Sequence, residues 1–464
     1  MKLYNFKTTA SGVRLYPTRF GAIFRTVPFQ EMADIIRLSP CLFTLERHAA
    51  EPLQLIFRDE GLAGRFFALV SDIVSPALLH DPAALRPEQI SETCRELLDS
   101  HGQNIRKCLE FILRQGINHG ASDIMLEYRG ESFEVSCKLD GLIVSVFGAD
   151  VDTGNRLINA LKTAAGLLIY RSDTIQEGRL NIGRSDHSQD LRVSIVPAGG
   201  RERVVVRLFD RLKSNATLDD LGITPLARLG FRRSIAAPGG LVLVCGPSGS
   251  GKTTTVYAAL RELKQERGRL GGIITVEDPI EYLLEGIAQI EVDPVGSVSF
   301  ASAVRSVLRQ DPSVIMIGEI RDEETADSAV TAALTGHLVL ATLHASSAAE
   351  AVTRLLDLGV RPVMLNSVLQ AILCQRLVRR PCSECAGKGC TACHDSGYRG
   401  RSCIAELMET TPGLQSMISA GEANSRQIEL YAAAEGMVTL RQAAIISMQS
   451  GETDQREVTR VTGC

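Results

Sequence analysis

The chain has 464 residues, of which 45% are hydrophobic and 22% charged, and its formal net charge is −4. This length predicts two to four domains with packed cores, and the slightly negative charge argues against a dominant electrostatic grip on nucleic acid. No apolar run reaches the roughly 20 residues of a membrane span. The first residues, Met1 to Lys7, show no signal-peptide pattern. We therefore expect a cytoplasmic multidomain enzyme without a transmembrane segment.

The N-terminal part of the chain has mixed patterning and contains no motif that indicates a chemistry. A stretch from Pro76 to Pro87 contains three prolines, which is typical of a linker. We therefore expect residues 1–95 to form a small N-terminal domain of unclear role.

The next part predicts a second α/β domain. Apolar residues recur at helical spacing from Ile105 to Ile117, and residues 133–139 alternate as a half-buried strand does. We place this domain at residues 101–212, and the polar segment from Lys213 to Pro225 connects it to the remainder of the chain.

Residues 225–464 alternate strands with helices. Helical patterns separate four apolar runs that are typical of core strands, at residues 241–245, 273–276, 314–317 and 338–343. Such alternation predicts a doubly wound parallel sheet, and therefore an α/β fold. Ligands of such sheets bind at the carboxyl ends of the strands, which is where several polar residues stand: Glu277, Asp278, Glu319 and His344.

A phosphate-binding motif follows the first of these strands. The pattern G-x-x-x-x-G-K-[ST] is formed by Gly246, Pro247, Ser248, Gly249, Ser250, Gly251, Lys252 and Thr253. Backbone N–H groups of such a loop surround phosphates, Lys252 can reach the β- and γ-phosphates, and the Thr253 hydroxyl can ligate Mg²⁺. We predict that ATP and Mg²⁺ bind at these residues and at the adjoining Thr254.

Carboxylates follow two further core strands. Residues 275–281 contain Glu277, Asp278 and Glu281, one of which we expect to orient the attacking water. Glu319 follows Gly318 where a Walker B strand usually ends in Asp-Glu, so it is the expected anchor for Mg²⁺. The alternative for each is an ordinary solvated carboxylate at a strand end.

Four of the twelve cysteines form a cluster, which comprises Cys382, Cys385, Cys390 and Cys393. Two C-x-x-C pairs supply four thiolates, the usual ligands of a structural Zn²⁺, and the glycines between them can turn the backbone tightly. The last three cysteines also match the C-x₄-C-x₂-C spacing of some iron–sulfur proteins. We predict zinc, with an iron–sulfur cluster and metal-free thiols as the alternatives.

Several segments together resemble the type II secretion and type IV pilus assembly ATPases. In the nucleotide domain they are the phosphate-binding loop and residues 275–282, 309–322 and 334–344. Upstream, the similarity to that family's second N-terminal domain lies in residues 120–124, 139–141, 178–179, 190–194 and 204–207. The resemblance covers about residues 103 to 450, and it implies a RecA-like P-loop domain preceded by a smaller PAS-like α/β domain.

The resemblance also implies roles that spacing alone does not assign. Glu281 would activate water, and Glu319 would be the Walker B glutamate. His337 and His344 would be the two histidines of the family's His-containing segment, and we expect both to take part in catalysis. Arg192 and Arg207 match arginines of the second N-terminal domain that reach phosphates in a hexameric ring. The cysteine cluster matches an element that is typical of the assembly ATPases rather than of the retraction ATPases.

The function implied by the resemblance is Mg²⁺-dependent ATP hydrolysis by a cytoplasmic homohexamer that powers type IV pilus assembly or type II protein secretion. Its partner would be an inner-membrane platform protein, so the ring would lie peripherally at the inner membrane. Rotation of residues 101–212 against residues 225–464 would supply the stroke. The alternatives are a type IV secretion or DNA-transfer ATPase of related fold, and a nucleotide-binding scaffold ring with low turnover.

Overall fold

The structure is a computed structural model that describes residues 3–9, 12–17, 25–28, 32–39, 42–47, 50–57, 85–99, 104–182, 189–208, 216–267, 272–292, 298–420 and 424–463. Contacts between residues divide the chain into two units, Met1–His119 and Gly120–Cys464. The domain limits predicted at residues 101 and 212, and most of the proline-containing linker, lie outside the described residues. Residue 95 lies inside a helix of the first unit.

The first unit contains a sheet and a helix pair. Its six strands are arranged in the order β3-β2-β1-β6-β5-β4, with bounds β1 Leu3–Thr9, β2 Gly12–Pro17, β3 Arg25–Pro28, β4 Met32–Ser39, β5 Leu42–Arg47 and β6 Ala50–Phe57. Helix α3 spans Pro87–Asp99 and α4 spans Ile105–Asn118, the helix that the apolar spacing predicts. Gln115 of α4 accepts the backbone N–H of Leu85 at 3.0 Å, which fastens the start of α3 to α4.

The second unit begins with an antiparallel sheet in the order β10-β11-β12-β7-β8-β9. The bounds are β7 Asp123–Arg129, β8 Ser132–Leu139, β9 Leu142–Asp150, β10 Gln176–Ile182, β11 Gln189–Ala198 and β12 Arg201–Leu208. Helix α5 (Val151–Ala164) packs on β7, β8 and β9. Its N-cap Asp150 accepts the N–H of Thr153, which satisfies one of the free donors of the first turn.

The nucleotide domain is built on a seven-stranded sheet in the order β15-β14-β16-β17-β13-β18-β19. Its strands are β13 Gly240–Cys245, β14 Gly272–Glu277, β15 Ala288–Glu291, β16 Pro312–Ile317, β17 Leu338–Leu343, β18 Leu369–Pro381 and β19 Tyr398–Glu409. All neighbouring pairs are parallel except β18 with β19. The predicted RecA-like α/β fold and its four core strands are therefore confirmed.

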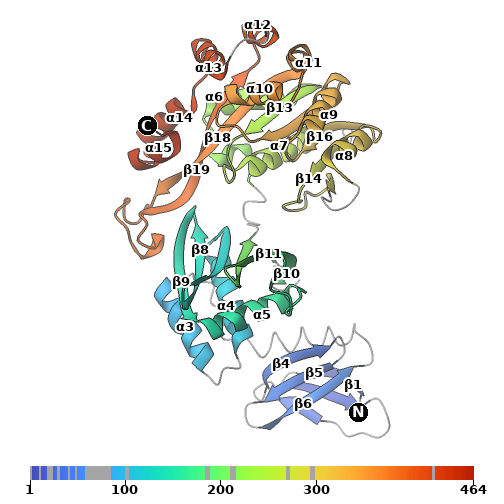
Figure 1. Cartoon of the computed structure of the whole chain (residues 1–464), viewed down its shortest axis with the longest axis vertical. Coiled ribbons are helices and arrows are strands. Elements are labelled where there is room, and N and C mark those ends of the chain that lie inside the picture. The colour runs from blue at the N-terminus through green and yellow to red at the C-terminus, as the bar shows by residue number, and fades with distance from the viewer. Residues whose placement is uncertain are drawn as a thin grey trace. The chain divides into compact units, whose positions relative to one another are not determined.

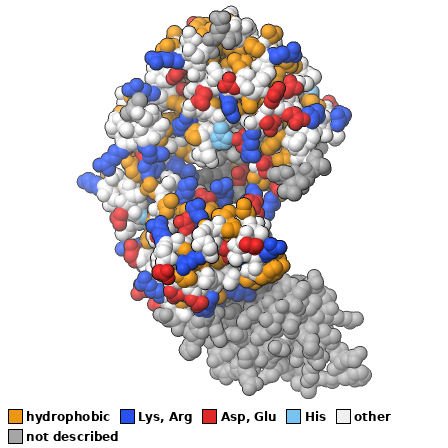
Figure 2. Space-filling view, viewed as in Figure 1, with side chains coloured by type: hydrophobic (Ala, Val, Ile, Leu, Met, Phe, Trp, Pro, Cys, Tyr) orange, Lys and Arg blue, Asp and Glu red, His pale blue; other side chains and the backbone are white. Residues whose placement is uncertain are grey.

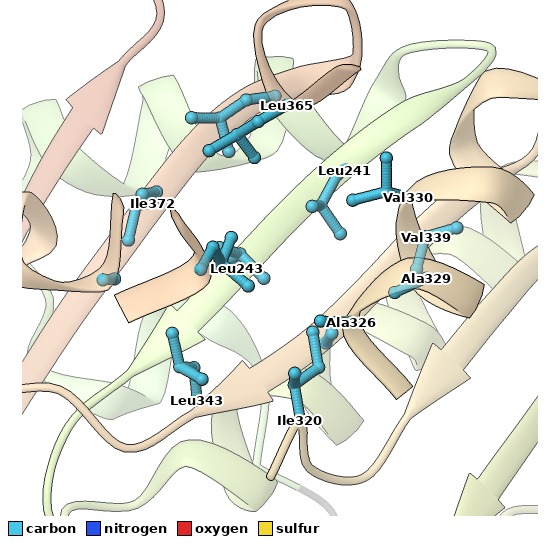
Figure 3. Packing of buried hydrophobic residues seen from close by; sticks show 14 of the residues in the cluster. Leu241, Leu243, Ile320, Ala326, Ala329, Val330, Val339, Leu343, Leu365 and Ile372 are labelled. Carbon is cyan, nitrogen blue, oxygen red and sulfur yellow. The ribbon is translucent and has the colours of Figure 1, made fainter. Parts of the chain in front are cut away.

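Helices cover both faces of this sheet (Figure 1). On one face lie α6 (Pro225–Ala236) and α7 (Lys252–Arg267). On the other lie α8 (Phe300–Val307), α9 (Glu323–Leu334), α10 (Ala348–Asp357) and α11 (Pro362–Val368). Alternate residues of β13 point to opposite faces, so Leu241 and Leu243 pack toward α9 (Figure 3), whereas Val242 and Val244 pack toward α7. All residues of β13 are buried, as expected of a central parallel strand.

Strands β18 and β19 form a long antiparallel hairpin that the sequence analysis did not predict. The cysteine cluster forms its tip, because Cys382 directly follows β18 and residues 394–397 alone separate Cys393 from β19. The C-terminal helices are α12 Pro412–Ala420, α13 Ser425–Ala434, α14 Leu440–Gln449 and α15 Gln455–Thr462. Helix α14 packs on β19 and α15 on β18 (Figure 1).

A buried ion pair fastens α15 to the hairpin. Glu457 is fully buried, and its carboxylate accepts the backbone N–H of Arg379 at 2.9 Å, the Arg379 Nε at 2.8 Å and the Arg460 Nη2 at 2.7 Å. Burial opposes ionisation, but these hydrogen bonds from Arg460 and Arg379 outweigh it and lower the pKa of Glu457 to about 2. The carboxylate therefore stabilises the fold in its charged form.

We expect Glu457→Gln to destabilise the protein by about 3 kcal/mol at pH 7, because it leaves two guanidinium groups without their counter-charge. The folded-state pKa lies below the unfolded value, so this contribution is complete above about pH 4.5 and is lost as the pH falls toward 2. Urea unfolding followed by circular dichroism at several pH values measures it. The control is Glu324→Gln, which removes an exposed ion pair with Arg305 and should cost less than about 1 kcal/mol; equal losses for both variants would contradict the assignment.

Candidate active site

The phosphate-binding loop joins the end of β13 to the start of α7. Gly249 and Gly251 have φ values of 74° and 88°, a region that favours glycine, so the loop can curl tightly. Lys252 Nζ donates to the carbonyl oxygens of Gly246 at 2.8 Å and Pro247 at 3.1 Å. Burial lowers the pKa of Lys252, whereas the nearby carboxylate of Glu319 acts to raise it. The lysine is thus held over the loop and close to the predicted Walker B glutamate.

Gln375 of β18 binds the backbone of the phosphate-binding loop. This contact was not predicted from the sequence. Its Nε2 donates to the backbone oxygen of Ser250 at 2.7 Å across 125 positions of sequence, and Gln375 is 1% exposed. Within the described residues, Ser250 Oγ is buried without a hydrogen-bond partner. A buried hydroxyl without a partner is expected to gain a hydrogen bond when a phosphate, or a water bound to it, occupies the loop. No local motif marks Gln375, since only the pairing of β18 with β13 brings it here.

The carboxyl ends of the central strands meet at this edge of the sheet. Cys245 is paired with Leu343, and Ile317 with Ala341, so the residues that follow these strands come together. Glu319 Oε1 lies 3.0 Å from His344 Nε2, which joins two of the predicted site residues.

Arg321 extends this group to the next strand. Its Nε donates to Glu319 Oε2 at 2.8 Å, and its Nη1 lies 3.3 Å from Asp278 Oδ2. Arg321 lies in a segment of family resemblance, residues 309–322, but no role for it was predicted from the sequence. In the structure Arg321 holds the carboxylates of two strands together at the predicted nucleotide edge.

The three carboxylates of residues 275–281 have different surroundings. Glu277 is 2% exposed and accepts hydrogen bonds from the Tyr257 hydroxyl, from Thr275 Oγ1 at 2.5 Å and from Gln289 Nε2 at 3.0 Å. With these donors Glu277 is turned into the protein and braces the strand. This geometry argues against Glu277 as the residue that orients water.

Glu281 is only partly buried, and within the described residues its carboxylate forms no hydrogen bond or ion pair. Burial raises the pKa of Glu281, and the guanidinium groups of Arg207 and Arg192 partly offset that rise. A carboxylate with a raised pKa that lies within electrostatic range of two arginines has the character expected of a general base near transferring phosphate.

Three arginines stand side by side on neighbouring strands, and we call them the arginine row: Arg179, Arg192 and Arg207. The register pairs Arg179 with Arg192 and Arg192 with Arg207, so their side chains leave the same face of the sheet. Each has a carboxylate partner within 3.1 Å: Arg179 with Glu291 at 2.9 Å, Arg192 with Glu177 at 2.6 Å and Arg207 with Asp123 at 3.1 Å. A role at the phosphates was predicted for Arg192 and Arg207 but not for Arg179.

His337 is not brought to this site within the chain. It precedes β17, so it lies at the amino end of the strand whose carboxyl end carries His344. Six strand residues at about 3.3 Å each separate the two histidines by roughly 20 Å. The His337 Nδ1 instead lies 3.0 Å from the backbone oxygen of Ala332 and 3.1 Å from Thr335 Oγ1. His337 directly precedes the predicted strand at residues 338–343, so its position at the amino end already follows from the sequence, and the role that the family resemblance implies for His337 stays a prediction.

The four thiols of the cysteine cluster converge on one point, with all ligand atoms within 4.8 Å of one another. Cys390 Sγ lies 3.8 Å from Cys382 Sγ and 3.7 Å from Cys393 Sγ, and Cys385 Sγ lies 3.8 Å from Cys393 Sγ. Four sulfurs held about 2.3 Å from a tetrahedral zinc ion are about 3.8 Å apart. The donor set therefore fits a single tetrahedral metal ion.

Backbone N–H groups support the thiolate form of Cys393, whereas burial raises the pKa of Cys390 to about 11. Gly389 N donates to Cys385 Sγ and Cys390 N to Cys393 Sγ, both at 3.2 Å. Burial opposes ionisation of Cys393, but the N–H groups of Cys390 and Gly397 and the neighbouring thiols lower its pKa to about 7. The thiolate is the form that binds metals.

Comparison with known proteins agrees with this architecture. A family model described as type II/IV secretion system protein matches residues 99–460. The chain is 39% identical to the type II secretion system protein HxcR of Pseudomonas aeruginosa, over 90% of this chain and 91% of that one. It is 38% identical to the type II secretion system ATPase E of Vibrio cholerae (79% and 77% covered) and 39% identical to the type IV pilus assembly ATPase PilB of Myxococcus xanthus (76% and 67%).

Solved structures share the fold. The ATPase DotB of Legionella pneumophila has a TM-score of 0.61 at 22% identity and covers 76% of this chain and 95% of its own. The pilus retraction motor PilT with bound ADP has a TM-score of 0.55 at 24% identity, covering 76% and 96%. At this level of identity the likeness concerns the fold alone.

Proposed function

We propose, because this chain belongs to the type II/IV secretion system protein family, that it works as a homohexameric ring that powers type II protein secretion or type IV pilus assembly. The chain is an ATP hydrolase of that family. The observation that carries the proposal is the convergence of Lys252, Glu319, His344 and Asp278 on one edge of the sheet, with Glu281 within electrostatic range of Arg207 and Arg192.

The proposed chemistry follows from these positions. Lys252 and the loop N–H groups bind the β- and γ-phosphates, and Glu281 orients the attacking water and accepts its proton. Thr253 and Glu319 are the residues that would hold Mg²⁺, which neutralises charge on the phosphates when it is bound. Arg192 and Arg207 supply forked positive charge to the γ-phosphoryl group as it transfers. His344 orients the carboxylate of Glu319.

The arginines suggest how hydrolysis becomes movement. In this structure Arg192 and Arg207 pair with carboxylates of their own sheet, at 2.6 and 3.1 Å. Contact with ATP would draw the arginine-bearing domain toward the phosphates, and loss of the γ-phosphate would release it. We propose this motion between residues 120–208 and the nucleotide domain as the stroke of the motor.

The ring is proposed to dock on an inner-membrane platform protein and to lie at the membrane through that partner. Within the described residues, no helix is long and apolar enough to cross a membrane. On the face shown in Figure 2, Lys and Arg side chains lie among Asp and Glu side chains over the described surface, and several Lys and Arg side chains lie near one another at its middle left.

A gene deletion distinguishes the two machines. We expect loss either of surface pili or of exported enzymes, and complementation with the unaltered gene but not with Lys252→Ala should restore the lost function. A deletion strain that keeps both its pili and its exported enzymes would contradict the proposal.

We further propose that the cysteine cluster binds one structural zinc ion. A closed shell of four thiolates leaves no open position for catalysis, so the metal would stabilise the tip of the β18–β19 hairpin. We expect the double variant Cys390→Ser, Cys393→Ser to lose zinc yet to bind Mg²⁺-ATP as before. Elemental analysis after purification under reducing conditions measures the metal, with Cys403→Ala, a buried cysteine outside the cluster, as the control that keeps it. Protein without zinc, or with iron and acid-labile sulfide, would refute the assignment.

A further inference from the structure

Glu291, the last residue of β15, joins two parts of the second unit through its two carboxylate oxygens. Oε1 lies 2.9 Å from Arg179 Nη2 of the arginine row, and Oε2 accepts the backbone N–H of Ile280 at 3.1 Å. Ile280 directly precedes Glu281. One carboxylate therefore connects the arginine-bearing sheet to the backbone of the residue next to the proposed base.

The strand pairing fixes where Glu291 acts. Glu291 is paired with Glu277 in the β14–β15 register, and Val292 N donates to the backbone oxygen of Glu277 at 2.8 Å. The backbone of residues 278–281 leaves β14 at this pair and is held at its far end by the hydrogen bond from Ile280 to Glu291. Loss of that acceptor would leave the segment before Glu281 without this side-chain anchor.

The Arg179–Glu291 ion pair can orient the Glu291 side chain, and its contribution to stability is small enough for a domain movement to break it. The side chains of Arg179 and Glu291 are 66% and 39% exposed, and ion pairs in such surroundings contribute only about 0–1 kcal/mol to stability. The pair is one contact in a wider arrangement of opposite charges. The hydrogen bond to Glu177 raises the pKa of Arg192, burial opposes this, and the charges of Asp278 and Glu291 add to the rise.

We propose that Arg179 is a positioning residue for hydrolysis, which orients Glu291 so that its other oxygen holds Ile280 and thereby places Glu281. The inference rests on the proposed role of Glu281 as the base. It gives the third member of the arginine row a task that differs from phosphate contact. When loss of the γ-phosphate releases the arginine-bearing domain, separation of Arg179 from Glu291 frees the segment that carries Glu281, so domain motion and catalytic geometry are linked.

The test begins with steady-state kinetics of the purified full-length protein. We expect Arg179→Ala to lower kcat roughly tenfold, because small displacements of a reacting group are costly, with KM for ATP little changed. Arg179→Lys, which keeps a charge opposite Glu291, should recover part of the loss. Arg203→Ala is the matched control, since Arg203 is an exposed arginine of the same sheet whose partner Glu127 lies within that sheet. An unchanged kcat in Arg179→Ala would overturn the inference.

A charge exchange separates positioning from simple tethering. Arg179→Glu combined with Glu291→Arg restores an ion pair but leaves no acceptor for the Ile280 N–H, so we expect kcat to stay low. Full recovery of kcat would show that only the attraction between the arginine-bearing sheet and β15 matters. That result would overturn the positioning role of Arg179.

Amide hydrogen exchange supplies a readout that does not depend on the role of Glu281. In Arg179→Ala, the peptide that contains Ile280 should exchange several-fold faster than in the unaltered protein. If exchange accelerates while Glu281→Gln remains fully active, the proposed function of Glu281 fails but the contact is real. If Glu281→Gln is inactive while neither exchange nor kcat changes in Arg179→Ala, only this inference fails.

Discussion

Glu281→Gln is expected to bind Mg²⁺-ATP with nearly unaltered affinity and to lose hydrolysis by about 10²–10⁴-fold, the usual effect of removing a general base. The amide keeps the size of the side chain but cannot accept a proton. Equilibrium binding of a fluorescent ATP analogue and phosphate release under saturating ATP measure the two quantities separately.

Glu277→Gln is the control for this prediction. Glu277 accepts three hydrogen bonds in a buried position, so an amide there should destabilise the strand by about 1–3 kcal/mol. It should leave the hydrolysis step of the folded protein far less affected than Glu281→Gln does. Full turnover in Glu281→Gln would transfer the role of base to Asp278, the remaining carboxylate of this segment near the edge.

Arg207→Ala is expected to reduce turnover by on the order of 10³-fold, because an arginine that reaches a transferring phosphoryl group stabilises charge that develops only in the transition state. Affinity for ATP should change much less. Within the structure Arg207 is 62% exposed at its side chain and pairs with Asp123, so its loss should have little effect on folding. Thermal unfolding of the variant checks that expectation.

Mixed rings test whether the arginine acts between subunits. If Arg207 acts on the site of a neighbouring subunit, rings that combine Arg207→Ala subunits with Lys252→Ala subunits contain some interfaces with an intact loop and an intact arginine. Turnover above that of either variant alone is then expected. Absence of recovery at every mixing ratio, with mixed assembly confirmed by differently tagged subunits, would show that Arg207 does not act across the interface.

The fold of the nucleotide domain follows from the sequence because its core strands are continuous apolar runs that end in polar residues. Residues 241–245 and 338–343 are buried throughout. The G-x-x-x-x-G-K-[ST] pattern directly follows residue 245 and predicts the turn from that strand into the next helix. The β18–β19 hairpin was missed because residues 382–397 separate its two strands, so no short turn signal marks the pairing. The strands of the first unit have no motif of their own to mark them.

Site residues could be predicted from the sequence where a chemically suitable side chain directly follows a core strand. They could not be predicted where contacts between distant segments determine the role of the side chain. Glu319 and His344 follow core strands, and the structure places them 3.0 Å apart. Gln375 supports the loop from a strand more than a hundred residues away, so its role depends on sheet order. Glu277 is polar at a strand end like its neighbours, yet buried donors turn it inward, which residue type alone does not reveal.

The most direct test of the whole account is the rate of Mg²⁺-dependent phosphate release from ATP by the purified full-length protein, compared with that of Lys252→Ala. Lys252 lies in the phosphate-binding loop beside Glu319, so its loss removes contacts with the phosphates in both the bound and the transition state. The account predicts hydrolysis that requires Mg²⁺ and falls by at least about 10²-fold in Lys252→Ala. Assembled, unaltered protein that releases phosphate no faster than Lys252→Ala would contradict it.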